Sequence, residues 1–499
     1  MRNGEVSYWW QALGGYPARR PSLPGPLEAD VCIVGGGYTG LWTAYYLAGL
    51  RPGLRIVVLE AAFAGYGASG RNGGWVTADL PGSRARYAKA AKGGTVKGGT
   101  AEGTAGVRAL EAALRDTVDE VGRVCVAESI DCDFVKGGRL SVATTPSQLA
   151  RLRGGLAAIR EWGDGNDVYE FLSGDETRAR VNVAGALGGL FAPASARVQP
   201  AALAAGIAAA AERRGVEIFE ATPVSAIVPA GADGGVGAVA QTKFGDVRAR
   251  SVLRCTEGYT AALPGQRRTL LPMNSHMIVT EPLPSGAWQE IGWDGRETLG
   301  DEAHAYMYAQ RTADGRIALG GRGVPYRFGS ALDHLGETDQ STVDALSAVL
   351  WRMFPAAADA AIAHAWCGVL GVPRDWCATV TYNAACGTGW AGGYTGVGVA
   401  ASNLAGRTLA DLVAGEPSPL TALPWVGYRS RTWEPEPARW AGVHGLYALY
   451  RFADRLESAG SPEGAEAAGG GKGGTALGTR VRLGEALGHV GDAISGIPH

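Results

Sequence analysis

The chain has 499 residues, more than a single hydrophobic core usually organises, so we expect two intertwined domains. Glycine supplies 77 residues, about twice its usual share of roughly 7%, but an apolar fraction of 46% is normal for a packed globular protein and excludes disorder throughout. The 46 Lys and Arg residues against 48 Asp and Glu residues give a formal net charge of −2, which offers no basic excess for a nucleic-acid partner.

The cysteines and the N-terminus indicate the compartment. The seven cysteines form no CxxC pair and have no histidine at zinc-ligand spacing, so we expect reduced thiols and no metal site. No apolar run is long enough for a signal peptide or a membrane-spanning helix. The sequence therefore predicts a cytoplasmic protein without a membrane partner.

A strand, a glycine-rich turn and a helix form the first motif. Residues 30–34 (DVCIV) are apolar and largely β-branched, as in a buried strand, and residues 35–40 (GGGYTG) match the GxGxxG pattern. Apolar residues then recur at positions 41, 44, 45 and 48, the spacing of one face of an amphipathic helix. The motif predicts a dinucleotide-binding βαβ unit with the phosphates at the N-terminus of the helix.

The glycines of this motif have different predicted roles. Gly35 permits the tight turn, Gly37 lets the backbone approach a pyrophosphate, and Gly40 lets the helix pack closely on its strand. A second buried strand, 55–59, ends at Glu60, which we expect to accept hydrogen bonds from an adenosine ribose. A carboxylate there disfavours the 2′-phosphate of NADP, whereas the motif alone does not separate NAD from FAD.

Residues 65–74 (GYGASGRNGG) follow where a nicotinamide-binding domain would place its second βα unit. Their five glycines bring backbone N–H groups close to a flat or anionic ligand. Ser69, Arg71 and Asn72 are side chains able to reach phosphates or the polar edge of a ring.

These motifs resemble the D-amino acid oxidase superfamily of FAD-dependent oxidoreductases, and within it the gamma-glutamylputrescine oxidase-like amine oxidases. The resemblance extends over most of residues 27–415 and includes segments 197–200, 217–224, 258–259 and 393–398. It implies FAD as the cofactor. Some relatives attach the flavin through a cysteine; Cys367, Cys377 and Cys386 lie in the corresponding half of the chain, but no attachment motif matches, so we expect FAD to be held without a covalent bond.

The residues expected to hold FAD come from five parts of the chain. They are Gly35, Gly37, Tyr38, Thr39 and Gly40; Glu60; Ala68, Ser69, Arg71, Asn72, Gly73 and Gly74; Val224; and Gly393, Tyr394, Thr395, Gly396, Val397 and Gly398. For Val224, whose backbone would touch the adenine, the alternative of an ordinary core valine stays open.

The middle of the chain alternates helices and strands. We expect helices over 107–122, 146–161 and 201–214, and strands over 138–143, 216–219 and 225–228, with a mobile low-complexity loop over 89–106. Period-two alternation over 271–330 predicts antiparallel sheet. It places Asn274, His276 and Ile278 on one face, and His304, Tyr306, Tyr308 and Gln310 on one face of the next strand. Such a face lines a cavity or meets solvent.

The expected fold class is α/β, a Rossmann-type FAD-binding domain interleaved with an α+β substrate domain on a mostly antiparallel sheet. We assign 27–82, 190–265 and 366–415 to the FAD-binding domain and 107–189 and 266–365 to the substrate domain. Residues 416–499 form a partly disordered C-terminal extension, with a proline-rich wrapping tail over 417–437 and a disordered linker over 463–478 before a short final helix.

The glycine-rich turn at 390–398 is the clearest catalytic feature. It leads into a helix that ends at Gly415, so the first N–H groups, near 395–399, would point at the electron-rich edge of the flavin, where the resemblance also places this loop. Such donors stabilise the negative charge that develops there during reduction.

Residues above the ring are predicted from chemistry alone. His276, Tyr306 and Tyr308 are candidates to shape the pocket or to accept the ammonium proton, and Arg322 to pair with a substrate carboxylate. For each of them a structural role is the alternative; Arg322, for example, would then hold a loop carboxylate.

The predicted activity is FAD-dependent oxidation of a carbon–nitrogen bond in an amine or amino acid, with hydride transfer to flavin N5, hydrolysis of the imine and reoxidation by O2 to give H2O2. The partners are then a small-molecule amine and O2, with the oligomeric state open. Alternatives are an amine dehydrogenase with another electron acceptor, a specialised biosynthetic flavoenzyme of the same fold, and a non-catalytic FAD-binding scaffold.

Overall fold

The computed structural model describes residues 1–90, 101–163, 165, 168–231, 237–321, 323, 325–332, 335–458 and 474–495. Arg322, residues 91–100 of the predicted 89–106 loop and residues 463–473 of the predicted linker lie outside this described part. No helix in the described ranges is long and apolar enough to cross a membrane.

One sheet has a parallel centre built from short apolar strands. Its order is β10-β11-β12-β2-β3-β9, with β12 also pairing β19 and β19 pairing β18. β2, β3, β9 and β12 are mutually parallel, with Cys32 opposite both Val57 and Val252. The bounds are β2 Leu27–Val34, β3 Ile56–Leu59, β9 Glu217–Phe219, β10 Val224–Val228, β11 Ala238–Thr242, β12 Val247–Arg254, β18 Thr379–Asn383 and β19 Thr388–Gly392. Residues 31–34 of β2 and all of β3 are apolar and buried, as expected where both faces of a strand are covered.

The second sheet has nine strands and is mostly antiparallel, as expected. Its order is β1-β17-β13-β16-β15-β14-β5-β7-β6, and only the β1–β17 and β14–β5 pairs are parallel within its described strands. The bounds are β1 Arg2–Asn3, β5 Arg139–Ala143, β6 Glu170–Ser173, β7 Gly188–Ala192, β13 Leu271–Thr280, β14 Thr298–Asp301, β15 Tyr308–Arg311, β16 Ile317–Gly321 and β17 Ile362–Val372. A small sheet pairs β4 (Trp75–Thr77) with β8 (Ser195–Arg197).

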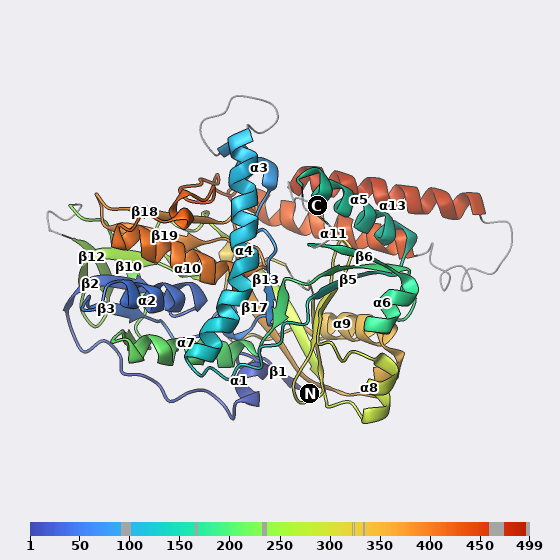
Figure 1. Cartoon of the computed structure of the whole chain (residues 1–499), viewed down its shortest axis with the longest axis horizontal. Coiled ribbons are helices and arrows are strands. Elements are labelled where there is room, and N and C mark those ends of the chain that lie inside the picture. The colour runs from blue at the N-terminus through green and yellow to red at the C-terminus, as the bar shows by residue number, and fades with distance from the viewer. Residues whose placement is uncertain are drawn as a thin grey trace.

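The helices lie in groups beside the two large sheets. α2 and α10 lie with the first sheet, α5, α6, α8 and α9 lie with the second, and α4 stands between them (Figure 1). The bounds are α1 Tyr8–Ala12, α2 Tyr38–Leu50, α3 Arg84–Ala90, α4 Ala101–Ala127, α5 Pro146–Glu161, α6 Gly174–Arg180, α7 Pro200–Arg213, α8 Ser285–Ile291, α9 Gln340–Met353, α10 Gly398–Ala414, α11 Ala438–Ser458 and α13 Gly474–Ser495. The division into domains stays a prediction; its boundaries at 190 and 366 fall inside β7 and β17.

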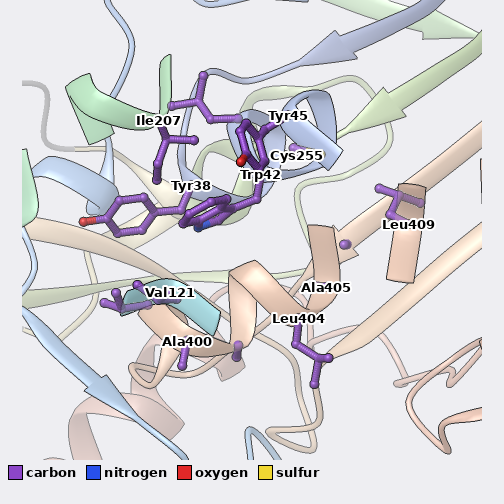
Figure 2. Packing of buried hydrophobic residues seen from close by; sticks show 14 of the residues in the cluster. Tyr38, Trp42, Tyr45, Val121, Ile207, Cys255, Ala400, Leu404, Ala405 and Leu409 are labelled. Carbon is purple, nitrogen blue, oxygen red and sulfur yellow. The ribbon is translucent and has the colours of Figure 1, made fainter. Parts of the chain in front are cut away.

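The largest apolar cluster lies around α2. Tyr38 and Trp42 of α2 face Ala400 of α10 and Val121 of α4 in this cluster (Figure 2). The expected amphipathic pattern for this helix was wrong, because α7 and α10 pack on sides of α2 that the pattern leaves to solvent. Trp42 and Thr43 are therefore fully buried as well.

Three expectations about the chain path need correction. The predicted strand through 304–310 begins only at Tyr308, so His304 and Tyr306 lie in the preceding turn rather than on a common strand face. The predicted loop over 89–106 contains the end of α3 and the first turns of α4, where the small Gly103 packs against the backbone of Ala88. Residues 474–478 of the predicted linker are helical, and the final helix is long, because α13 packs against α11.

Candidate functional site

The GxGxxG turn joins β2 to α2 at the carboxyl end of the parallel strands. A β-carbon added at Gly40 would overlap the carbonyl oxygen of Gly35, so the helix approaches the strand as closely as its backbone allows. Gly36 N–H donates to the Glu60 carboxylate at 2.8 Å, which places the acid at the end of β3 directly beside the turn. Burial raises the pKa of Glu60, opposed by hydrogen bonds from Ala62 and Gly36.

Ser69 and Tyr394 bring two distant glycine-rich segments to this helix end. The N–H of Tyr38 donates to Ser69 Oγ at 2.8 Å, so the 65–74 loop meets the first turn of α2. On the same turn, Thr39 Oγ1 and Tyr394 Oη are 3.0 Å apart and share a hydrogen bond. The expected FAD residues from three segments therefore lie together.

Asn72 and Arg71 stabilise the loop that carries them. The Asn72 amide donates to the carbonyls of Ala68 and Ser69 at 3.1 and 2.8 Å, and its oxygen accepts from Gly74 N–H at 2.7 Å. Arg71 is 1% exposed; its Nε donates to the Tyr66 carbonyl at 2.8 Å and its guanidinium lies 4.4 Å from the centre of the Tyr66 ring. These contacts are internal to the loop, whereas ligand contact by Arg71 and Asn72 stays a prediction.

The N-terminal segment supports this loop from outside the GxGxxG unit. Ser7 Oγ donates to the Gly70 carbonyl at 2.7 Å, and Trp9 Nε1 donates to the Asn72 carbonyl at 2.8 Å. Trp9 and Trp10 are almost completely buried. Sequence reasoning missed this role, although two adjacent tryptophans so near a terminus are a signal for a docked segment.

Gln310 and Tyr308 connect β15 to the end of the loop. Gln310 Nε2 donates to the carbonyls of Gly73 and Val198 at 2.6 and 3.2 Å. A β-carbon at Gly73 would lie 2.7 Å from the Tyr308 ring, and Tyr308 Oη lies 2.8 Å from Ser275 Oγ. Tyr308 therefore sits between the loop and β13 of the second sheet.

The second glycine-rich turn lies between β19 and α10. Gly393 and Gly396 have φ angles of +83° and +113°, which favour glycine. The Glu257 carboxylate accepts hydrogen bonds from the N–H groups of Gly393 and Tyr394 at 3.1 to 3.2 Å and holds this turn. Burial raises the pKa of Glu257 to about 7, opposed by those hydrogen bonds. Sequence reasoning missed Glu257, which directly precedes the Gly258-Tyr259 turn.

Glu257 is expected to make stability depend on pH. Its pKa is about 7 in the folded chain and 4.5 in its unperturbed form, so the folded state holds the extra proton between these values and loses stability as pH rises from 4.5 to 7. A tenfold difference in proton affinity corresponds to about 1.4 kcal/mol. Between pH 4.5 and 7 we therefore expect the free energy of unfolding of wild type to fall by on the order of 3 kcal/mol more than that of Glu257→Gln. Urea unfolding at several pH values measures this pH dependence, with the exposed Glu28→Gln as control. If the free energy of unfolding changes with pH equally in wild type and Glu257→Gln, the prediction is contradicted.

Tyr306 lies opposite the second glycine turn. A β-carbon at Gly396 would lie 3.9 Å from Tyr306 Oη, and the Tyr306 side chain is 40% exposed. Its turn is held on both sides: Asp301 accepts from Met307 N–H at 2.9 Å, and Asp454 of α11 accepts from Ala305 N–H at 2.9 Å. Burial raises the pKa of Asp301 to about 7.

His304, Asp454 and Glu457 are grouped as metal ligands would be. Arg151 binds both oxygens of Glu457 at 3.0 and 2.8 Å, and Asp454 accepts from the N–H of His304 at 2.8 Å. The carboxylate oxygens are thus engaged by protein donors, and the cluster joins α5 and α11 to the turn that carries Tyr306.

His276 is not brought together with the tyrosines. On β13 the neighbouring Ser275 faces Tyr308, so alternation turns His276 to the other side, where its Nδ1 lies 3.2 Å from Thr338 Oγ1. Ile278, on the same face as His276, packs with Val343 of α9. Val224 begins β10, two residues after Thr222, whose N–H donates to the Glu60 carbonyl at 2.8 Å.

The site fits a dinucleotide with an attached ring. Gly37 and Val397 stand at the N-caps of α2 and α10 and offer no side-chain acceptor there, so both helices present backbone N–H groups. The first of these helix ends suits a pyrophosphate and the second an electron-rich ring edge. Glu60 stands beside the first helix end, where a ribose hydroxyl would donate to it.

Known proteins are similar to this chain in sequence and in fold. "Probable oxidoreductase OrdL" of Rhizobium meliloti is 28% identical over 425 residues, and "Gamma-glutamylputrescine oxidoreductase" of Escherichia coli is 29% identical over 425 residues; each alignment covers 83% of this chain and 90% of the relative. The crystal structure of glycine oxidase from Geobacillus kaustophilus superposes with a TM-score of 0.65 at 20% identity, covering 81% of this chain and all of that one, and so shows the same fold.

The family assignment rests on most of the chain. The sequence model of the DAO family, described as "FAD dependent oxidoreductase", matches residues 30–412. This range contains both glycine-rich turns, Glu60 and the tyrosines of β15 and its preceding turn. The chain therefore belongs to the DAO family of FAD-dependent oxidoreductases, and its cofactor is FAD.

Proposed function

We propose that this enzyme oxidises the carbon–nitrogen bond of a small-molecule amine or amino acid. The observation that carries the proposal is the approach of Tyr306 to the Gly396 turn, just before the N-terminus of α10: a β-carbon at Gly396 would lie 3.9 Å from Tyr306 Oη. The backbone N–H groups there would stabilise negative charge on the reduced ring, while Tyr306 would contact the substrate. The name of the Escherichia coli relative, a gamma-glutamylputrescine oxidoreductase, supports an amine as substrate.

The reaction follows from this placement. Bound FAD supplies the acceptor for the hydride that leaves the carbon beside the nitrogen. The substrate nitrogen must be neutral, so an ammonium proton first passes to a base or to solvent, and Tyr306 and Tyr308 would orient the amine. The resulting iminium takes up water and releases a carbonyl compound and an amine or ammonia. O2 takes the two electrons and two protons, giving H2O2.

Anaerobic reduction tests the substrate class. The purified FAD protein is mixed under nitrogen with amino acids and gamma-glutamylated polyamines, and the visible absorption of the flavin is followed. We expect at least one of these amines to bleach the flavin. Flavin that keeps its absorption with every amine, yet is bleached by dithionite, would reject amine oxidation and favour a structural FAD.

The same reduced protein is then used to identify the electron acceptor. On admission of O2, an oxidase restores the flavin absorption and yields one H2O2 per amine consumed. Slow reoxidation by O2 together with rapid reduction of an artificial dye would instead identify a dehydrogenase.

A further inference from the structure

A mostly apolar cavity of about 120 Å³ lies between α11 and the second sheet. Its walls include Met273 of β13, Trp376 after β17, and Trp433, Leu446 and Tyr447 from the C-terminal extension. The extension lies beyond residue 412, where the family match ends. Figure 1 shows α11 and α13 packed on the part of the molecule that contains the second sheet. The extension thus closes the cavity from outside the family match, against Met273 and Trp376, which lie within it.

Two neighbouring residues, Met273 and Leu370, lie between the cavity and the second glycine-rich turn. Met273 stands opposite Leu370 in the register of β13 and β17, and both belong to the apolar cluster that contains Trp433 and Tyr447. Tyr447 Oη donates to Met273 Sδ at 3.4 Å. On its other side, Leu370 Cδ1 would lie 3.9 Å from a β-carbon at Gly396, the same point that Tyr306 approaches. The Met273–Leu370 pair therefore joins the glycine turn to the cavity.

The charged residues on the cavity wall are already neutralised by acids. Arg374 Nε lies 3.0 Å from both oxygens of Glu434, and its guanidinium lies 5.1 Å from the centre of the Trp433 ring. Arg439, 3% exposed, binds Glu436 at 2.9 Å and donates to the Arg267 carbonyl at 2.9 Å. Since each cation has its carboxylate, the cavity favours an uncharged group over an acidic one.

We propose that this cavity is a specificity subsite that takes an uncharged aromatic or branched apolar tail of the amine substrate. The amine carbon lies at the glycine turn, and the tail passes Met273 and Leu370 to pack between Trp376, Trp433 and Tyr447. The inference rests on the proposed function for the position of the amine. It assigns substrate selection to the C-terminal extension.

A pair of glycines on α11 provides a matched test. Gly442 lines the cavity, whereas Gly445 does not, and a β-carbon at either position would meet no described atom within 4 Å. Gly442→Leu should therefore fill the cavity without a clash in the helix, and Gly445→Leu should add the same side chain outside it. Both changes replace a glycine inside the same helix, so their effects on helix propensity match.

Binding is measured without relying on turnover. The FAD-loaded protein is titrated anaerobically with 4-phenylbutylamine and with butylamine, using tryptophan fluorescence and calorimetry. We expect wild type and Gly445→Leu to bind 4-phenylbutylamine at least about 10-fold more tightly than butylamine, as for a buried apolar group, and Gly442→Leu to lose this preference.

Two results would overturn the subsite: equal affinities of wild type for both amines, including no measurable binding of either, or an unchanged preference in Gly442→Leu. The preference together with a flavin that no amine bleaches would reject the proposed function while supporting the subsite. If small amines bleach the flavin but wild type binds 4-phenylbutylamine no more tightly than butylamine, the subsite is rejected and the proposed function is supported.

Discussion

Gly40→Val is expected to give protein that is purified almost without FAD. The added β-carbon would overlap the carbonyl oxygen of Gly35 and lie 3.1 Å from Ile33 Cγ2, and both neighbours belong to the buried β2–α2 unit. Relief requires moving α2 away from β2, which separates the helix N-terminus from the turn that would hold the pyrophosphate. Overpacking of this kind costs about 1 to 3 kcal/mol or more, so we also expect a lower unfolding temperature.

The flavin-to-protein absorbance ratio and thermal unfolding measure this effect. Gly49→Val is the matched control, because a β-carbon at Gly49, in the same helix, would meet only the end of the Arg214 side chain, at 2.5 Å. A Gly40→Val protein with a full complement of FAD would show that close contact between α2 and β2 is not needed for binding.

Arg71→Met is expected to lower both stability and FAD affinity. Arg71 donates to the carbonyls of Tyr66 and Cys367 at 2.8 and 3.4 Å, and so joins the 65–74 loop to β17. Methionine fills similar volume but cannot donate to these carbonyls, at a cost of about 1 to 3 kcal/mol for each lost hydrogen bond. The loop then loses its fixed position against the second sheet, so we expect FAD to bind at least about 10-fold more weakly.

Urea unfolding and titration of the FAD-free protein with FAD measure the two effects separately. Arg2→Met, in the N-terminal strand and with 54% of its side chain exposed, is the control for loss of a cation. Unchanged FAD affinity together with reduced stability would show that Arg71 supports the fold alone. Unchanged values of both would refute its role in fixing the loop.

The local sequence pattern predicted several elements in both parts of the molecule. The β2–α2–β3 unit forms around the GxGxxG turn, and helices α5 and α7 lie within a residue of their predicted bounds, because caps and apolar periodicity act over neighbouring residues. Gly215 and Gly415, at φ +87° and +70°, follow the ends of α7 and α10 as expected. The pattern did not predict burial of nearly all of α2, since that depends on helices much later in the chain.

Short motifs were therefore enough to predict the family, the cofactor and the glycine turns, since these depend on local segments with one low-energy conformation. The fold was needed to show that Tyr306 approaches Gly396, that His276 faces Thr338, and that Glu257 holds the second turn. Alternation along a strand places side chains on two faces, but it does not say which face meets the cofactor. Contacts between segments far apart in the sequence decide which face this is. In the same way, α11 closes the cavity beside Met273 of β13.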